Sequence, residues 1–252
     1  MPIYPVKHVS WSEVEDWSMR LAEKIASSGF KPDVVVAVGR GGYIVSRLLC
    51  DYIDVDKLIA VPIKWSEKEK REGENYLADL IRCFMTREVD SCIANVVRNL
   101  SITIPVEIQT DLKNMKSLAV EEVTATGLHL AKVKQILLEW GSSEVKTATL
   151  VWKAQTSTLK PDYTFIEPKR FVWFQFPWSR ISDYQQFVKI LVDEYKKQEI
   201  QSVDIDKLVH DIKNFYGFKP STIHLKKALR NLEKHGIIKV LDNKILLMKG
   251  CN

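Results

Sequence analysis

The stretch Ser117-Leu-Ala-Val-Glu-Glu-Val-Thr-Ala-Thr-Gly-Leu-His-Leu130 decides how the rest of this 252-residue chain is interpreted. Its apolar run, Leu118–Val120, is typical of a strand buried on both faces, and the run ends at Glu121 and Glu122. From Leu130 onward, apolar residues recur at helical spacing. The stretch therefore predicts a strand, a polar loop and a helix.

The loop of this stretch has the composition of an anion site. Thr124–Gly127 supplies small residues, two hydroxyl groups and a glycine directly before a helix, where backbone N–H groups and the helix dipole favour a phosphate. The neighbouring Glu121 and Glu122 would repel a phosphate unless they bind ribose hydroxyls or a hydrated Mg²⁺. Together the two features indicate a sugar phosphate as ligand.

A second strand, loop and helix lie nearer the N-terminus. The apolar run Asp33–Val38 predicts a central parallel strand, and Gly39-Arg-Gly-Gly42 follows it before a helix that contains Ile44 and Leu48. Glycines let a ligand lie against peptide N–H groups, and Arg40 adds a fixed positive charge. This loop is also predicted to bind an anion.

Two further predicted strands end in lysine. Leu58–Ile63 is followed by Lys64, and Val145–Trp152 is followed by Lys153. Strands that alternate with helices predict an α/β fold, in which a parallel sheet is flanked by helices and ligands bind at the carboxyl ends of the strands. All the candidate ligand-binding groups follow such strand ends.

The stretch Leu118–Gly127 resembles the signature that binds phosphoribosyl diphosphate (PRPP) in type I phosphoribosyltransferases. It has the same order of an apolar strand, two acidic residues, two spacers and Ala-Thr-Gly. The resemblance implies that Glu121 and Glu122 hold the ribose and, indirectly, Mg²⁺. It assigns the 5′-phosphate to Thr124, Ala125, Thr126, Gly127 and Leu128, and the pyrophosphate to Gly39, Arg40, Gly41, Gly42 and Lys64. Glu121, Glu122, Arg40 and Lys64 would be the catalytic residues. The family usually has Asp where this chain has Glu122.

The region after Lys153 resembles the base-binding hood of 6-oxopurine phosphoribosyltransferases. In that comparison Val123, Lys153, Phe171 and Val172 bind the base: the lysine donates to the 6-oxygen, and the aromatic ring stacks. Ala125 instead gives the Ala-Thr-Gly of adenine phosphoribosyltransferases. We expect an enzyme of purine salvage that transfers ribose 5-phosphate from PRPP to N9 of adenine, with hypoxanthine, guanine or xanthine as the alternative base.

The segment 66–102 is longer than the mobile loop that usually closes over the site in this family. Their apolar spacing predicts two helices, which would form a lid or part of an oligomer interface, and a short strand is predicted at 102–108. Residues 1–181 would thus form the phosphoribosyltransferase core and hood, with this helical insertion.

Residues 182–252 are predicted to form a separate, winged-helix-like α+β domain, so that the chain resembles an archaeal-type enzyme with an added C-terminal domain. Three helices precede a hairpin that turns at Asp242 and Asn243. Residues 186–252 hold 13 Lys+Arg and 8 Asp+Glu, whereas the rest of the chain is neutral. A role in dimerisation or regulation is favoured. The alternative is a non-catalytic PRPP-sensing regulator whose tail binds DNA.

The remaining expectations concern location and partners. No CxxC pair occurs among the four cysteines, Cys50, Cys83, Cys92 and Cys251, so zinc is not expected. We expect the cysteines to be reduced and the protein to be cytoplasmic. No apolar run approaches the roughly 18 residues that span a bilayer, and no membrane association is expected. The expected partners are PRPP, a purine base, the product nucleotide and a second copy of the chain, in a homodimer. Nucleic acid is not favoured as a partner.

Overall fold

The computed structural model describes residues 5–63, 79, 83, 89–98 and 110–248. It forms two compact units, Trp11–Phe171 and a second unit that combines Met1–Ser10 with Val172–Asn252. The first residues group with the C-terminal part because strand β1 (Val6–His8) pairs with strand β7 (Trp173–Gln175). The domain boundary predicted after residue 181 stays a prediction. In the described part of the chain, no helix is long and apolar enough to cross a membrane.

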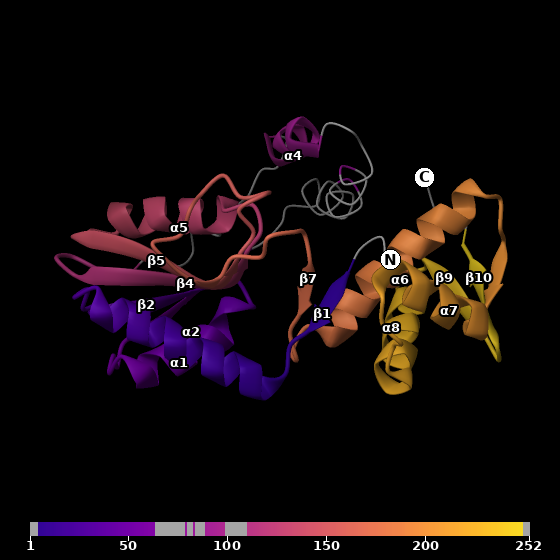
Figure 1. The fold of residues 1–252 in the computed structure, drawn as a ribbon, viewed down its shortest axis with the longest axis horizontal. Helices are drawn as coiled ribbons and strands as arrows, with labels where there is room; N and C mark the ends of the chain where they lie inside the picture. Colours follow the sequence, from indigo (N-terminus) through magenta and orange to yellow (C-terminus); the bar gives the residue numbers. More distant parts are fainter. Residues whose placement is uncertain (1–4, 64–78, 80–82, 84–88, 99–109, 249–252) are drawn as a thin grey trace. The chain divides into compact units, whose positions relative to one another are not determined.

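The unit Trp11–Phe171 contains the predicted parallel sheet flanked by helices. Its strands lie in the order β3-β2-β4-β5-β6, and every neighbouring pair is parallel. The strands are β2 (Val34–Val38), β3 (Leu58–Val61), β4 (Lys116–Thr124), β5 (Glu144–Trp152) and β6 (Tyr163–Ile166). Figure 1 shows α1 (Trp11–Ser27) and α2 (Gly42–Tyr52) on one face and α5 (Leu128–Glu139) on the other. The predicted fold class is confirmed, although β6 was not predicted.

Strand β4 corrects one expectation, because it does not end at the acidic pair. It continues through Glu121 and Glu122 to Thr124, where it still pairs with Trp152 of β5. Its other neighbour, β2, pairs with it only as far as Val120. The ladder to β5 carries the strand past the apolar run, so the two carboxylates project from within the last part of the strand and not from its end.

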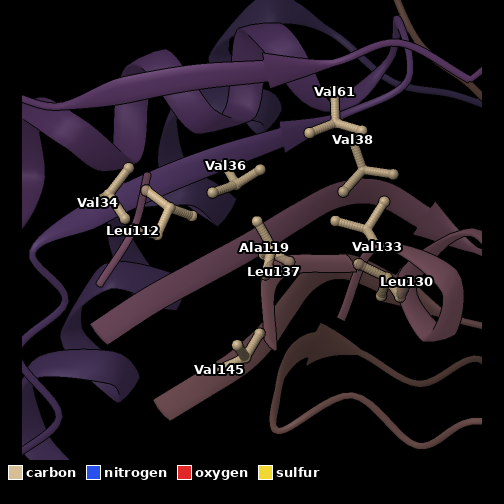
Figure 2. Close-up of a cluster of buried hydrophobic side chains, with 10 residues drawn as sticks. All are labelled: Val34, Val36, Val38, Val61, Leu112, Ala119, Leu130, Val133, Leu137 and Val145. Atoms are coloured by element: carbon tan, nitrogen blue, oxygen red, sulfur yellow. The ribbon is translucent and has the colours of Figure 1, made fainter. Parts of the chain in front are cut away.

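The sheet is held to its helices by aliphatic packing. Figure 2 shows the cluster between the sheet and α5, to which β2, β3, β4, β5 and α5 all contribute side chains. Its ten buried members are Val34, Val36, Val38, Val61, Leu112, Ala119, Leu130, Val133, Leu137 and Val145. Each buried branched side chain contributes about 1.5–3 kcal/mol relative to exposure. This packing fixes the carboxyl ends of β2 and β4 beside the first turn of α5.

The second unit contains the predicted C-terminal helices and hairpin. Its helices are α6 (Arg180–Lys197), α7 (Ile205–Tyr216) and α8 (Thr222–Lys234), and its hairpin is β9 (Ile238–Leu241) with β10 (Lys244–Leu247). A further strand, β8 (Ser202–Asp204), was not predicted; it pairs with β10 and completes a three-stranded antiparallel sheet of order β8-β10-β9. Gly217 ends α7 in the left-handed conformation, with φ +81°.

Much of the predicted insertion lies outside the described residues, as do Lys64, Cys251 and the strand expected at 102–108. The described part includes α4 (Val89–Arg98) and a disulfide between Cys83 and Cys92. The expectation of reduced cysteines is therefore wrong for this pair. The sequence separation of nine residues gives by itself no signal that the two cysteines pair. Cys83 also packs with Ile93 in a small cluster that contacts Leu128 of α5.

Candidate functional site

The glycine loop 39–42 turns the chain from β2 into α2 at the carboxyl end of the sheet. Gly39 has φ +60°, a value that favours glycine, whereas Gly41 has ordinary helical angles of φ −71° and ψ −37°. A Cβ atom on Gly42 would lie within 3.0 Å of the Val120 carbonyl oxygen of β4. The loop thus lies directly against the backbone of the strand that carries the acidic pair. Arg40, at its tip, is exposed.

The Glu122 side chain brings the two predicted ligand loops together. A Cβ atom on Gly41 would fall on the Glu122 carboxylate, so that only glycine leaves room for this carboxylate above the loop. Residues 81 positions apart in the sequence thereby meet at one place. The acidic pair and the glycine loop, predicted as neighbours, are neighbours in the structure.

Glu121 is buried and is held by His129, a residue that sequence reasoning did not select. The His129 Nδ1 lies 2.7 Å from Glu121 Oε1, and the Thr124 hydroxyl lies 3.5 Å from Glu121 Oε2. Burial lowers the pKa of His129, but the charge and hydrogen bond of Glu121, with the charge of Glu122, raise it overall. The sequence signal that could have indicated this role is the polar His129 in the first turn of α5, between the apolar Leu128 and Leu130.

The predicted phosphate loop, residues 124–128, is anchored through its carbonyl groups. The Ala125 carbonyl accepts from the Thr156 hydroxyl at 2.5 Å, and the Thr126 carbonyl accepts from the backbone N–H of Thr158 at 2.9 Å. In a planar trans peptide the N–H points opposite to its C=O. The N–H groups of Thr126 and Gly127 therefore point away from the segment that holds the loop, as binding of an anion requires.

Gly127 is required at the start of α5. Its φ is +80°, and a Cβ atom there would lie 2.7 Å from Leu159 Cβ and 2.8 Å from the Leu159 backbone nitrogen. Leu128, the next residue, begins the helix, and its N–H donates to the Thr126 hydroxyl at 3.3 Å. The loop is therefore a close-packed turn whose shape depends on glycine.

Two of the predicted base-binding residues, Lys153 and Phe171, are in contact just after the end of β5. Lys153 is only 4% exposed, and its Nζ lies 4.2 Å from the centroid of the buried Phe171 ring, a cation–π contact. Val123 pairs with Val151 in the sheet and is half-buried. Val172 begins the other compact unit, so its predicted role stays a prediction, as does that of Lys64 outside the described residues.

The donor atoms at this site suit Mg²⁺ held indirectly. Among the described residues, no group of three or more His, Cys, Asp or Glu is arranged to bind a metal directly. Mg²⁺, however, commonly keeps several waters and uses one or two carboxylates together with substrate phosphates. The Glu121 and Glu122 carboxylates, beside two predicted anion loops, fit that pattern.

Two predicted anion loops and an acidic pair lie at the carboxyl edge of a parallel sheet with helices on both faces, the place where α/β proteins bind their ligands. The sequence model described as "Phosphoribosyl transferase domain" matches residues 10–184. The chain belongs to the phosphoribosyl transferase family.

Three solved structures are similar to this chain. A purine phosphoribosyltransferase from Pyrococcus horikoshii is 26% identical with a TM-score of 0.49, and the match covers 68% of this chain and 92% of that one. The xanthine-guanine-hypoxanthine phosphoribosyltransferase of Helicobacter pylori is 18% identical with a TM-score of 0.50, over 68% and 92% of the two chains. A Neisseria gonorrhoeae protein solved with ppGpp is 19% identical with a TM-score of 0.49, over 69% and 90%. A comparison with curated proteins found no significant match.

Proposed function

We propose that this protein is a purine phosphoribosyltransferase that transfers ribose 5-phosphate from PRPP to N9 of a purine base. The observation that carries the purine assignment is the buried Lys153 ammonium 4.2 Å from the Phe171 ring centroid. It combines a flat apolar face with a hydrogen-bond donor, which suits a planar heterocycle with polar edges. Family membership supports the transfer of a phosphoribosyl group.

The proposed ligand positions follow the two anion loops. The 5′-phosphate lies on residues 124–128, where the anchored carbonyl groups turn N–H groups outward. The ribose hydroxyls lie on Glu121 and Glu122, and the pyrophosphate lies on the glycine loop 39–42, with Lys64 as a further ligand. His129 orients the Glu121 carboxylate through its Nδ1 contact.

The reaction breaks the bond from C1′ to the pyrophosphate oxygen and forms a bond from C1′ to N9. The bonding pair leaves with the pyrophosphate, and the proton of N9 passes to solvent. Positive charge develops on the ribose ring, where the carboxylates of Glu121 and Glu122 stabilise it, and Arg40 stabilises the negative leaving group. Bound Mg²⁺ would supply further charge neutralisation for the pyrophosphate.

Adenine is the base that we propose, because Ala125 stands where 6-oxopurine enzymes of the family usually have an Asp that manages the N7 proton. Lys153 favours the second candidate, a 6-oxopurine, because an ammonium that faces adenine's amino group would leave donors unpaired at about 1–3 kcal/mol. A homodimer in the cytoplasm, acting in purine salvage, completes the proposal.

The test is PRPP-dependent nucleotide formation with Mg²⁺, in which adenine, hypoxanthine, guanine, xanthine and uracil are offered separately. AMP formation alone supports the adenine proposal. IMP, GMP or XMP formation would replace adenine with a 6-oxopurine. PRPP binding by calorimetry without product from any base would overturn catalysis and favour the PRPP-sensing regulator.

A further inference from the structure

The net charge of the whole chain is concentrated in one short part of the second unit. Residues 219–244 contain seven Lys+Arg and two Asp+Glu, a net charge of +5, which equals that of the entire chain. By contrast, residues 186–218 contain five basic and six acidic residues. Four of the seven cations lie on α8, one precedes it and two lie on the hairpin. We call them together the α8–hairpin surface: Lys219, Lys226, Lys227, Arg230, Lys234, Lys239 and Lys244.

All seven side chains of the α8–hairpin surface are exposed. In the described part of the chain, none of them makes an ion pair. One of the two acidic residues, Glu233, is engaged elsewhere, since its Oε1 accepts the N–H of Val240 at 2.8 Å. The surface therefore has a positive charge that the protein does not neutralise.

Helix α8 separates an apolar face from a basic face. Its buried residues are Leu225, Ala228, Leu229 and Leu232. Its basic residues, at positions 226, 227, 230 and 234, follow one exposed stripe, because residues three or four apart lie on the same face of a helix. The stripe begins at Ile223, which is 74% exposed. One face holds the helix on the unit, and the other is presented to solvent.

A hydrogen bond to α6 fixes the start of α8. The N–H of Ser221 donates to the Tyr184 hydroxyl of α6 at 3.1 Å. The buried Tyr216, at the end of α7, donates its hydroxyl hydrogen to the Phe187 carbonyl at 2.9 Å. The short connection from α7 to α8 is thereby pinned to α6 at both ends, so the exposed stripe is presented in a defined orientation.

The order α6, β8, α7, α8, β9, β10, with a three-stranded antiparallel sheet, is that of a winged helix. In helix-turn-helix proteins the second helix of the pair, here α8, enters the major groove. A helix of 13 residues is about 20 Å long, and the groove is about 12 Å wide, enough to admit it. The charge is therefore concentrated on the helix and hairpin that a duplex would meet.

We propose that the α8–hairpin surface binds duplex DNA. Phosphates of the duplex contact the lysines, and the start of α8, with the exposed apolar Ile223, faces the base edges of the major groove. Lysine is depleted in protein–protein interfaces. A surface whose cations are six lysines and one arginine therefore suits a phosphate backbone better than a second protein. This binding is independent of the proposed transferase activity.

The test uses the full-length protein and a short fluorescent duplex, with anisotropy measured between roughly 50 and 200 mM KCl. We expect binding whose log Kd rises linearly with log salt. The K226Q/K227Q variant removes two cations from α8 at nearly constant length and helix propensity. Its control, K196Q/K197Q, makes the same charge change at the exposed end of α6.

Loss of two phosphate contacts should lower the salt slope by about 1.8 and weaken binding tenfold to a hundredfold at roughly 100 mM salt. The control variant should bind like the wild type, and circular dichroism should show all variants folded. No binding by the wild-type protein would overturn the proposal, as would equal losses in the two variants. Preferential displacement of the duplex by RNA would overturn it in favour of an RNA partner.

Discussion

Alanine in place of Gly41 changes one contact in the candidate site, that between the glycine loop and the Glu122 carboxylate. The backbone at Gly41 accepts alanine, because φ −71° and ψ −37° are helical. Substitution of glycine by alanine at such a position stabilises a protein by about 0.4–1 kcal/mol. The G41A variant should therefore fold, with an unchanged or slightly raised Tm.

The cost of G41A should appear in catalysis. The new methyl group falls on the Glu122 carboxylate, which has to retreat to ordinary contact at 3.4 Å or beyond. This displacement exceeds about 1 Å, and a misplacement of that size can cost about a hundredfold in rate. We therefore expect kcat/KM for PRPP to fall about a hundredfold, equivalent to about 2.7 kcal/mol.

A second substitution separates this reasoning from a general loss of function. In the G41A/E122D variant the acidic side chain is shorter by one methylene group, so its carboxylate withdraws from the methyl group. We expect at least a tenfold recovery of kcat/KM relative to G41A, equivalent to about 1.4 kcal/mol. E122D alone supplies the fourth corner of the cycle.

The assay is PRPP-dependent nucleotide formation with the base that the wild type prefers, together with thermal unfolding of each variant. G42A is a structural control, because its methyl group meets the Val120 backbone rather than a side chain. It should lower the Tm, whereas G41A should not. Wild-type turnover by G41A, or equal turnover by G41A and G41A/E122D, would refute a catalytic role for the position of Glu122.

Three further predictions test other parts of the unit. The Asp162 Oδ2 accepts two hydrogen bonds, from the backbone N–H and from the hydroxyl of Thr147, both at 2.8 Å. Burial raises the pKa of Asp162, but these hydrogen bonds and the charges of nearby lysines lower it overall. Because folding lowers the pKa of Asp162 from its unfolded value of about 4, the ionised carboxylate stabilises the folded protein above about pH 4. D162A should therefore lower the free energy of unfolding, measured in urea, by about 1.5–3 kcal/mol at neutral pH and by progressively less on acidification. K153M should keep AMP formation within about threefold but lower any IMP or GMP formation by roughly ten- to a hundredfold, because it removes a charged donor; equal losses for both base classes would contradict this. Reduction of Cys83–Cys92 should destabilise the protein by about 2–3 kcal/mol, and an unchanged Tm in dithiothreitol would exclude a stabilising role.

The local elements of this protein could be predicted because their signals lie within one strand or helix. The apolar run 34–38 specified a buried central strand, and Gly217 and Gly236 marked helix ends. The hairpin turn at Asp242 and Asn243 was also recognisable. In each case the apolar period or the turn residue acts within a few positions, so no knowledge of distant partners was needed.

The sequence by itself predicted the parallel strands β2, β3, β4 and β5 and the loops and helices that follow β2 and β4, and it placed the candidate ligand groups near the carboxyl ends of these strands. Only the tertiary structure decided how far β4 runs, that Glu122 lies on Gly41, and that His129 holds Glu121. It also decided the pairing of β1 with β7. These features depend on ladder register and on close approach between distant segments, and such contacts leave no periodic trace in a single sequence.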